Sequence, residues 1–260
     1  RMGIIGAGLA TVIAQAISAI SCMWYIYKKY PEYIPEKGEW KLDRELSKEM
    51  LTTGLSMALM LSVFSIGSII LQRGINTLGT KIITAHTAAR RIIEIYMMPL
   101  STISTSNSTF VGQNYGARKM RRIRTTLKSV MVLDFAWAVL AFLITLFGGE
   151  LLIRVLIGTS DVYVIKNAMM SLWLSTLCLF PLGVLFVMRT SMQAVGYKVT
   201  PLLSSGIELT VKVVAAFALI PVIGYLGVAL AEPVTWVLCT VFLEIVYYAT
   251  RKKTIPLEDE

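Results

Sequence analysis

Ten ionisable side chains lie inside stretches of this sequence that are otherwise strongly apolar. They are Arg73, Arg90, Arg91, Glu94, Asp134, Arg189, Glu208, Lys212, Glu232 and Glu244. If these stretches cross a bilayer, each charge is costly to keep there, and such charges commonly serve the passage of ions, protons or polar substrates. These residues therefore predict the binding of ions, protons or polar substrates and their passage through a membrane.

Glu208 and Lys212 are four residues apart, with the acid first. This is the favourable order for an ion pair along a helix, and pairing neutralises both charges. We predict an intramembrane charge pair here, for which a purely structural role remains open.

Residues 82–106 have the clearest division into two faces. At 100° per residue, one half of the helix carries Thr84, Thr87, Arg90, Arg91, Glu94, Ser101, Ser104, Thr105 and Ser108, and the other half carries Ala85, Ala88, Ala89, Ile92, Tyr96, Leu100 and Ile103. The polar half predicts a water-filled cleft or a polar protein interior. A closed structural pair between Glu94 and Arg90 or Arg91 is the alternative, because the spacing permits it.

The sequence offers no set of catalytic or metal-binding residues. His86 is the only histidine, which excludes a histidine metal cluster, and we expect it to be packed or interfacial. Cys22, Cys178 and Cys239 are far apart in the sequence, with no metal or disulfide spacing. We predict neither an enzyme nor a metal site, and no cofactor.

Composition predicts an all-α polytopic membrane protein. The 260 residues are 55% hydrophobic and 16% charged, with a mean hydropathy of +0.67, whereas soluble domains carry about 25% charged residues. About seven transmembrane helices are expected, each near the ~20 residues that a bilayer needs. They cover residues 3–27, 51–71, 82–106, 130–148, 162–188, 201–222 and 225–249.

Sixteen of the 25 lysines and arginines lie in loops on one side of these spans: in 28–48, in 118–128, at Lys198 and in 251–253. The opposite loops hold only Lys81, Arg154 and Lys166. Because cytoplasmic loops concentrate Lys and Arg, we expect the basic loops and the C-terminus to be cytoplasmic, and we expect no nucleic-acid partner. With seven spans the first residue would then lie outside, which suggests that further spans precede it.

The stretch "ARRIIEIYMMPLSTISTSNSTFVGQNYGARKMRRI" resembles the multidrug and toxic compound extrusion (MATE) transporters, above all in "TFVGQNYGA" followed by basic residues. So do "GAGLATVIAQAIS", "LQRGINTLGT", "MRTSMQAVGYKVTPLLSSGIEL" and "GVALAEPVTW", in family order. The resemblance covers nearly the whole chain. It implies the last span of an N-terminal lobe (1–27), a cytoplasmic linker with an amphipathic surface helix (28–50), a C-terminal six-helix lobe (51–250) and a cytoplasmic tail (251–260).

The resemblance also implies an activity. The family exports amphipathic, often cationic compounds in exchange for H⁺ or Na⁺, and one lobe rocks against the other. We expect the same of the cell-membrane protein to which this chain belongs, with membrane lipids and small amphipathic cations as its partners. The expected substrate cleft contains Gln72, Asn76, Thr87, Arg91, Glu94 and Ser101.

The loop motif has a structural role in this interpretation. Gly112 and Gly116 would let a helix stop tightly at the cytoplasmic face, and Gln113 and Asn114 would bond the freed carbonyls. The arginines that follow would hold anionic headgroups.

Two departures from the family pattern concern the coupling ion. Some members carry a Glu in the first helix of the C-terminal lobe and an Asp in the fourth, and neither 51–71 nor 162–188 has a carboxylate at depth. We therefore expect the coupling site, for H⁺ or Na⁺, in the N-terminal lobe. A flippase of lipid-linked saccharides and, less favoured, a seven-span receptor or sensor remain as alternatives.

Overall fold

The computed structural model describes residues 3–34, 38, 43–158 and 160–254, and all regular structure within them is helical. The elements in chain order are α1 (Gly3–Lys29), a short 3₁₀ turn η1 (Pro31–Tyr33), α2 (Arg44–Asn76), α3 (Thr80–Gly116), α4 (Met120–Ile157), α5 (Val162–Leu177), α6 (Leu179–Ala194), α7 (Val199–Val214), a π-helical segment η2 (Ala215–Leu219), α8 (Ile220–Ile223) and α9 (Tyr225–Thr254).

Five helical segments among the described residues are long and apolar enough to cross a membrane: Gly8–Lys29, Arg44–Asn76, Met120–Ile157, Val199–Ile223 and Tyr225–Ala249. The pair α5 and α6, bent by 51° at its break, makes a sixth. At 37 residues, α3 has ample length but is more polar. The predicted fold class, an all-helical polytopic membrane protein, is confirmed.

The chain divides into two compact units, Arg1–Leu51 and Thr52–Glu260. The division falls inside α2, which begins at Arg44 and runs without interruption to Asn76. Asp43 caps its start, because its Oδ1 accepts hydrogen bonds from the backbone N–H groups of Glu45 and Leu46 at 2.8 and 3.1 Å.

The expected surface helix within 28–50 is therefore not a separate element where the structure describes it. Residues 44–50 form the first two turns of α2, since no proline or glycine stops the helix there. The earlier part of that expectation, around Trp40, lies outside the described residues. The expected tail, 251–260, begins as a continuation of α9, which ends at Thr254; residues 255–260 are also outside the described part.

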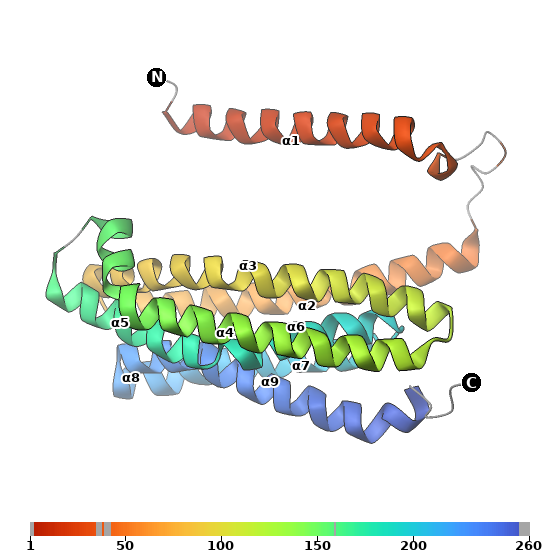
Figure 1. Cartoon of the computed structure of the whole chain (residues 1–260). Helices are drawn as coiled ribbons and strands as arrows, with labels where there is room; N and C mark the ends of the chain where they lie inside the picture. Colours follow the sequence, from red (N-terminus) through yellow and green to blue (C-terminus); the bar gives the residue numbers. More distant parts are fainter. Residues whose placement is uncertain (1–2, 35–37, 39–42, 159, 255–260) are drawn as a thin grey trace. The chain divides into compact units, whose positions relative to one another are not determined.

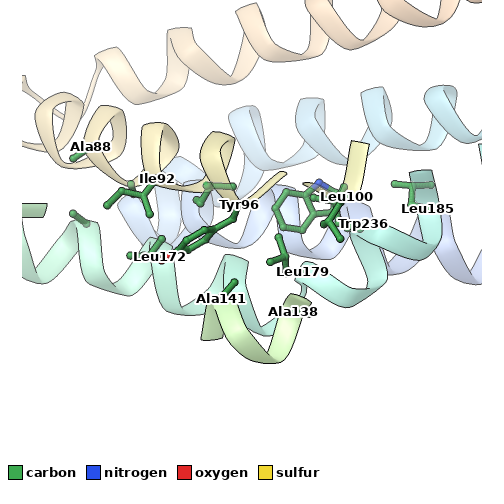
Figure 2. Packing of buried hydrophobic residues seen from close by; sticks show 14 of the residues in the cluster. Ala88, Ile92, Tyr96, Leu100, Ala138, Ala141, Leu172, Leu179, Leu185 and Trp236 are labelled. Atoms are coloured by element: carbon green, nitrogen blue, oxygen red, sulfur yellow. The ribbon is translucent and has the colours of Figure 1, made fainter. Parts of the chain in front are cut away.

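The core of the second unit forms where α3 meets α4, α5 and α6, and Trp236, Cys239 and Leu243 of α9 belong to the same cluster. The apolar half of α3 points into it: Ala88, Ile92, Tyr96 and Leu100 are buried, and Figure 2 shows them facing Leu172, Leu179 and Trp236. Alanines at contact positions let helix backbones approach closely, which matters in a bilayer because packing replaces the hydrophobic effect.

The break between α5 and α6 lies at Cys178. Pro181 follows three residues later, and its ring nitrogen has no hydrogen to donate, so the helical ladder is interrupted here. The carbonyl of Pro181 accepts a hydrogen bond from Thr240 Oγ1 of α9 at 2.7 Å. This bond fixes the start of α6 against α9.

Two glycines bring α2 against the segment from α7 to α8. A Cβ atom at Gly67 would lie 2.9 Å from Cδ of Lys212, and one at Gly74 would lie 2.6 Å from Cδ1 of Ile220. Ile220 follows η2, where the helix widens by one residue per turn. A side chain at either glycine would force the side chain of Lys212 or Ile220, or the helices themselves, to shift.

An ion pair joins the starts of α3 and α5 outside the predicted spans. Lys81 Nζ lies 2.7 Å from Asp161 Oδ2. The hydrogen bond from Lys81 and the backbone N–H of Tyr163 hold the pKa of Asp161 below its ordinary value, and the same bond to Asp161 raises the pKa of Lys81. Figure 1 shows the α3–α4 turn and the C-terminal end of α9 at the opposite end of these helices.

Candidate functional site

A cavity of about 460 Å³ lies inside the second unit. Six helices contribute to it, and its lining is mainly apolar with a few charged and hydroxyl groups: Met60, Leu61, Phe64, His86, Arg90, Ile93, Glu94, Met97, Ser171, Ser175, Leu182, Leu185, Phe186, Arg189, Thr190, Gln193, Ser205, Glu208, Val228, Ala229, Glu232 and Trp236. Volume and lining are those of small-molecule sites, which combine apolar walls with a few placed polar groups.

One side of the cavity is formed by a buried charge network from α6 and α7. Glu208 accepts from Lys212 Nζ at 3.0 Å on one carboxylate oxygen and from Arg189 at 3.2 Å on the other. The side chains of Lys212, Glu208 and Arg189 are 1%, 6% and 12% exposed. With two cations and one anion, the network as a whole carries a positive charge.

Both cations of this network make further polar contacts. Arg189 Nε donates to Ser204 Oγ at 2.9 Å, and Lys212 Nζ donates to Ser68 Oγ at 3.5 Å. The Lys212 ammonium also lies 4.0 Å from the ring centre of Phe64, a cation–π contact. Lys212 thus binds α7 to α2, while Arg189 is left at the cavity wall.

Two further acidic groups line the cavity. Glu94 accepts from Arg90 Nε at 3.0 Å in an ion pair whose side chains are 56% and 45% exposed. Glu232 of α9 is half-buried, and the described residues show no ion pair or hydrogen bond to it. The cavity therefore presents charges of both signs to anything that enters.

The structure brings some of the predicted site residues together and leaves others apart. The predicted pair Glu208–Lys212 is formed, and Glu94 lines the cavity. Other predicted cleft residues make local bonds: Gln72 donates to Asn76 Oδ1 at 2.8 Å along α2, Thr87 donates to the carbonyl of Ile83, and Ser101 donates to that of Met98.

Arg91 is exposed, as are Thr87 and Ser101. All three lie on the predicted polar half of α3. Ser104, assigned to the same half, is instead buried and its hydroxyl bonds that of Thr190 of α6 at 2.9 Å, so only part of that half faces away from the core. The assignment of Thr87, Arg91 and Ser101 to a cleft between two lobes stays a prediction.

The loop motif lies at the end of α3. Asn114 is buried and its side-chain amide donates to the carbonyl of Phe110 at 2.8 Å, while the carbonyl of Gln113 accepts from the N–H of Ala117. We expected Gly112 and Gly116 to let the helix stop tightly. The residue in the left-handed conformation after the helix is instead Arg118 (φ 56°). The turn is closed by the N–H of Lys119, which bonds the carbonyl of Asn114 at 2.8 Å.

The sequence did not place Arg189, Glu232 or His86 at this cavity, because the contacts that bring them there cross between helices. Arg189 reaches Glu208 from another helix, 19 positions away. Glu232 comes from α9, and His86 packs edge-on against Tyr225 of α9, with ring centres 6.1 Å apart. Sequence showed Arg189 and Glu232 as charges at membrane depth but gave no means to place them on one cavity.

The described residues contain no group of three or more His, Cys, Asp or Glu side chains that could hold a metal ion. The arrangement suits recognition of an organic molecule by apolar contact and charge. A bundle of membrane-length helices around such a cavity defines the class: a polytopic membrane protein with a site for a small molecule.

The family follows from the sequence comparison. The family model described as MatE matches residues 55–218, so the chain belongs to the MatE family. The resemblance inferred from the motifs is confirmed. The family is one of transporters, which confirms that the chain is not an enzyme and disfavours the receptor alternative.

Curated relatives are bacterial. "Probable multidrug resistance protein YpnP" of Bacillus subtilis is 26% identical over 198 residues, 75% of this chain and 43% of that protein. "Probable multidrug resistance protein NorM" of Thermotoga maritima is 24% identical over 221 residues, 85% of this chain and 47% of that protein. The chain spans about half the length of these relatives.

Solved structures share the fold. The Vibrio cholerae MATE transporter VcmN in the bent form superposes with a TM-score of 0.79 at 18% identity, over 97% of this chain and 57% of that one. A MOP superfamily transporter from Pyrococcus furiosus, whose binding pocket is described as reversed in polarity, gives 0.80 at 18% identity over 96% and 57%.

Proposed function

We propose that this chain is one lobe of a secondary transporter that exports small amphipathic, often cationic compounds in exchange for H⁺ or Na⁺. The observation that carries the proposal is the cavity, which joins apolar walls to acidic groups at Glu94 and Glu232. The names of the curated relatives, multidrug resistance proteins, support the substrate class.

The exposed half of α3 supports a second lobe beside this one. Arg90, Arg91 and Glu94 are exposed at the level of the expected bilayer. Charged side chains do not face lipid tails, so this half requires water or another part of the transporter. A substrate path between two lobes supplies both, and the lobes would rock about it.

The coupling site is proposed to lie in the other lobe. In the part of this chain that the structure describes, α2 has no acidic side chain between Met50 and its end at Asn76, and α5 and α6 have none. These are the helices in which some family members carry the coupling carboxylates. The ion itself, H⁺ or Na⁺, is not assigned.

Transport by the full-length protein tests the proposal. Reconstituted in vesicles with an imposed H⁺ or Na⁺ gradient, it should move a fluorescent organic cation such as ethidium. Ala229→Phe, which places a ring in the cavity from α9, should abolish transport, whereas Leu238→Phe, on the exposed side of the same helix, should leave it intact.

Equal yield and equal elution on size exclusion are required of both variants before their transport is compared. Gradient-independent leakage of the dye, or transport of a lipid-linked saccharide in place of the cation, would contradict the export proposal.

The proposed orientation in the cell membrane has its own test. In a background without cysteine, a cysteine at Met120 should be labelled by a membrane-impermeant thiol reagent from the cytoplasmic side only, and one at Lys81 from outside only. The reason is the concentration of basic residues beside Met120, which are retained in the cytoplasm. Labelling of both positions from the same side would contradict the span assignment and the cytoplasmic C-terminus.

A further inference from the structure

Asp134 is the most completely buried carboxyl group of the described chain. It lies in the middle of α4 with 0% exposure, away from the cavity, and neither of its oxygens has a hydrogen-bond partner. It forms no ion pair with any described residue. Of the other intramembrane acidic side chains, Glu94, Glu208 and Glu232 line the cavity, and Glu244 is only partly buried.

The partner surface of Asp134 is the second turn of α6. A Cβ atom added to Gly183 would lie 3.0 Å from both Cγ and Oδ2 of Asp134, so the carboxyl group is packed directly on the backbone of α6. Any larger residue in place of Gly183 would have to displace it. The α5–α6 break at Cys178 lies one turn before this contact.

The charged groups of the helices packed against α4 are turned elsewhere. On α3, Arg90 pairs with Glu94 and Arg91 is exposed. On α5, Lys166 is exposed, and on α6, Arg189 pairs with Glu208. Close to the contact in sequence, Cys178 has a half-buried thiol. On α4 itself, Lys128 lies almost two turns before Asp134 and Glu150 more than four turns after it.

An ionised carboxylate cannot be kept in such a place. Burying a charge without a partner or a hydrogen bond costs several kcal/mol even after relaxation. A bound metal cation would need several oxygen ligands, and the described residues offer no acidic or histidine cluster for one. A proton alone removes the charge without needing any further ligand.

We propose that Asp134 is a proton-binding site whose occupancy is coupled to the packing of α6 against α4. While α6 is packed as in this structure, the carboxyl group holds its proton. When α6 swings away at the Cys178 break, water reaches the carboxyl group and the proton is released. By linkage, binding of the proton favours the packed arrangement to the same degree.

This inference needs only that the lobe is embedded in a membrane, and it stands whichever substrate the transporter moves. Its two parts, the bound proton and the movement of α6, are tested separately in the full-length protein.

Infrared spectroscopy of the reconstituted protein tests the proton. At neutral pH the wild type should show the C=O stretch of a protonated carboxyl group that shifts in D₂O and is absent from Asp134→Asn, which keeps the shape of the side chain. Glu150→Gln is the control and should leave this band unchanged, because Glu150 is paired with Arg154 and exposed.

Identical spectra of wild type and Asp134→Asn in this region would overturn the proposal. A carboxylate band of Asp134 that responds to added Na⁺ would also overturn it, since the site would then hold a metal cation. Both proteins must show the same elution profile, so that loss of the band cannot be caused by misfolding.

Cys178 reports the movement of α6. With Cys22 and Cys239 replaced by serine and alanine, its rate of reaction with a membrane-permeant maleimide is measured across the pH range, with and without Asp134→Asn. Dividing the rate of the protein that retains Asp134 by the rate of Asp134→Asn removes the intrinsic pH dependence of the thiol. This ratio should rise with pH, because only the protein that retains Asp134 opens on deprotonation. A ratio that is constant with pH would refute the coupling.

Discussion

Glu208→Gln should strongly reduce the membrane yield and the melting temperature of the full-length protein. The change leaves the Lys212 ammonium and the Arg189 guanidinium near each other without the anion that lies between them. Removing one partner of a buried ion pair typically costs about 3–5 kcal/mol, because the remaining charge stays buried and unpaired. Thermal melts in detergent, followed by size exclusion, measure the effect.

The matched control and a rescue variant make the cause specific. Glu150→Gln breaks an ion pair of the same i,i+4 kind whose side chains are 58% and 43% exposed, and such pairs contribute at most about 1 kcal/mol. Combining Glu208→Gln with Lys212→Met removes the buried ammonium as well, and should restore much of the lost stability. If Glu208→Gln and Glu150→Gln lower the melting temperature equally, burial of the charge network contributes little to stability.

Glu94→Gln should fold normally but export organic cations about tenfold more slowly. The Arg90–Glu94 pair is about half exposed, so its loss costs little stability. Glu94 also lines the cavity, where a contact between its carboxylate and a cationic substrate worth ~1.4 kcal/mol corresponds to a factor of ten. Efflux of a fluorescent cation from reconstituted vesicles gives the rate.

A neutral substrate and Glu150→Gln serve as controls for this second prediction. Transport of an uncharged dye should be unaffected by Glu94→Gln, and Glu150→Gln, on α4 and outside the cavity, should leave transport of both dyes unchanged. If Glu94→Gln instead lowers yield and melting temperature while the surviving protein transports cations at the normal rate, the Arg90–Glu94 pair is structural.

The features that depend on residue spacing within a single helix were predicted from the sequence. The division of α3 into two halves follows from 100° steps, and Ala88, Ile92, Tyr96 and Leu100 are buried as that division requires. The Glu208–Lys212 pair is likewise a property of one helix. The long apolar runs fixed the class of protein, because backbone groups in a bilayer must bond within their own segment.

Contacts between residues of different helices, and helix boundaries that depend on tertiary packing, were not predicted from the sequence. Arg189 and Glu232 were visible as charges, but their approach to one cavity depends on the crossing of α6, α7 and α9. The first turns of α2 were assigned to a separate surface helix because Leu42, Leu46 and Met50 are four residues apart, whereas no residue after Arg44 interrupts the helix. The π-helical segment after Lys212 has no residue pattern that would reveal it.

That π-helical segment determines which kind of genetic change the C-terminal part can tolerate. A π turn accommodates one more residue than an α turn over the same length, so losing a single residue from Ala215–Leu219 would tighten it into an α-helix and leave the residues beyond it facing nearly as before. Ile220 would then keep its place in the notch at Gly74 into which its side chain fits. A one-residue deletion in the α-helical turns of α7 would instead rotate everything beyond it by about 100°, so single-codon deletions are expected to be tolerated better within Ala215–Leu219 than earlier in α7.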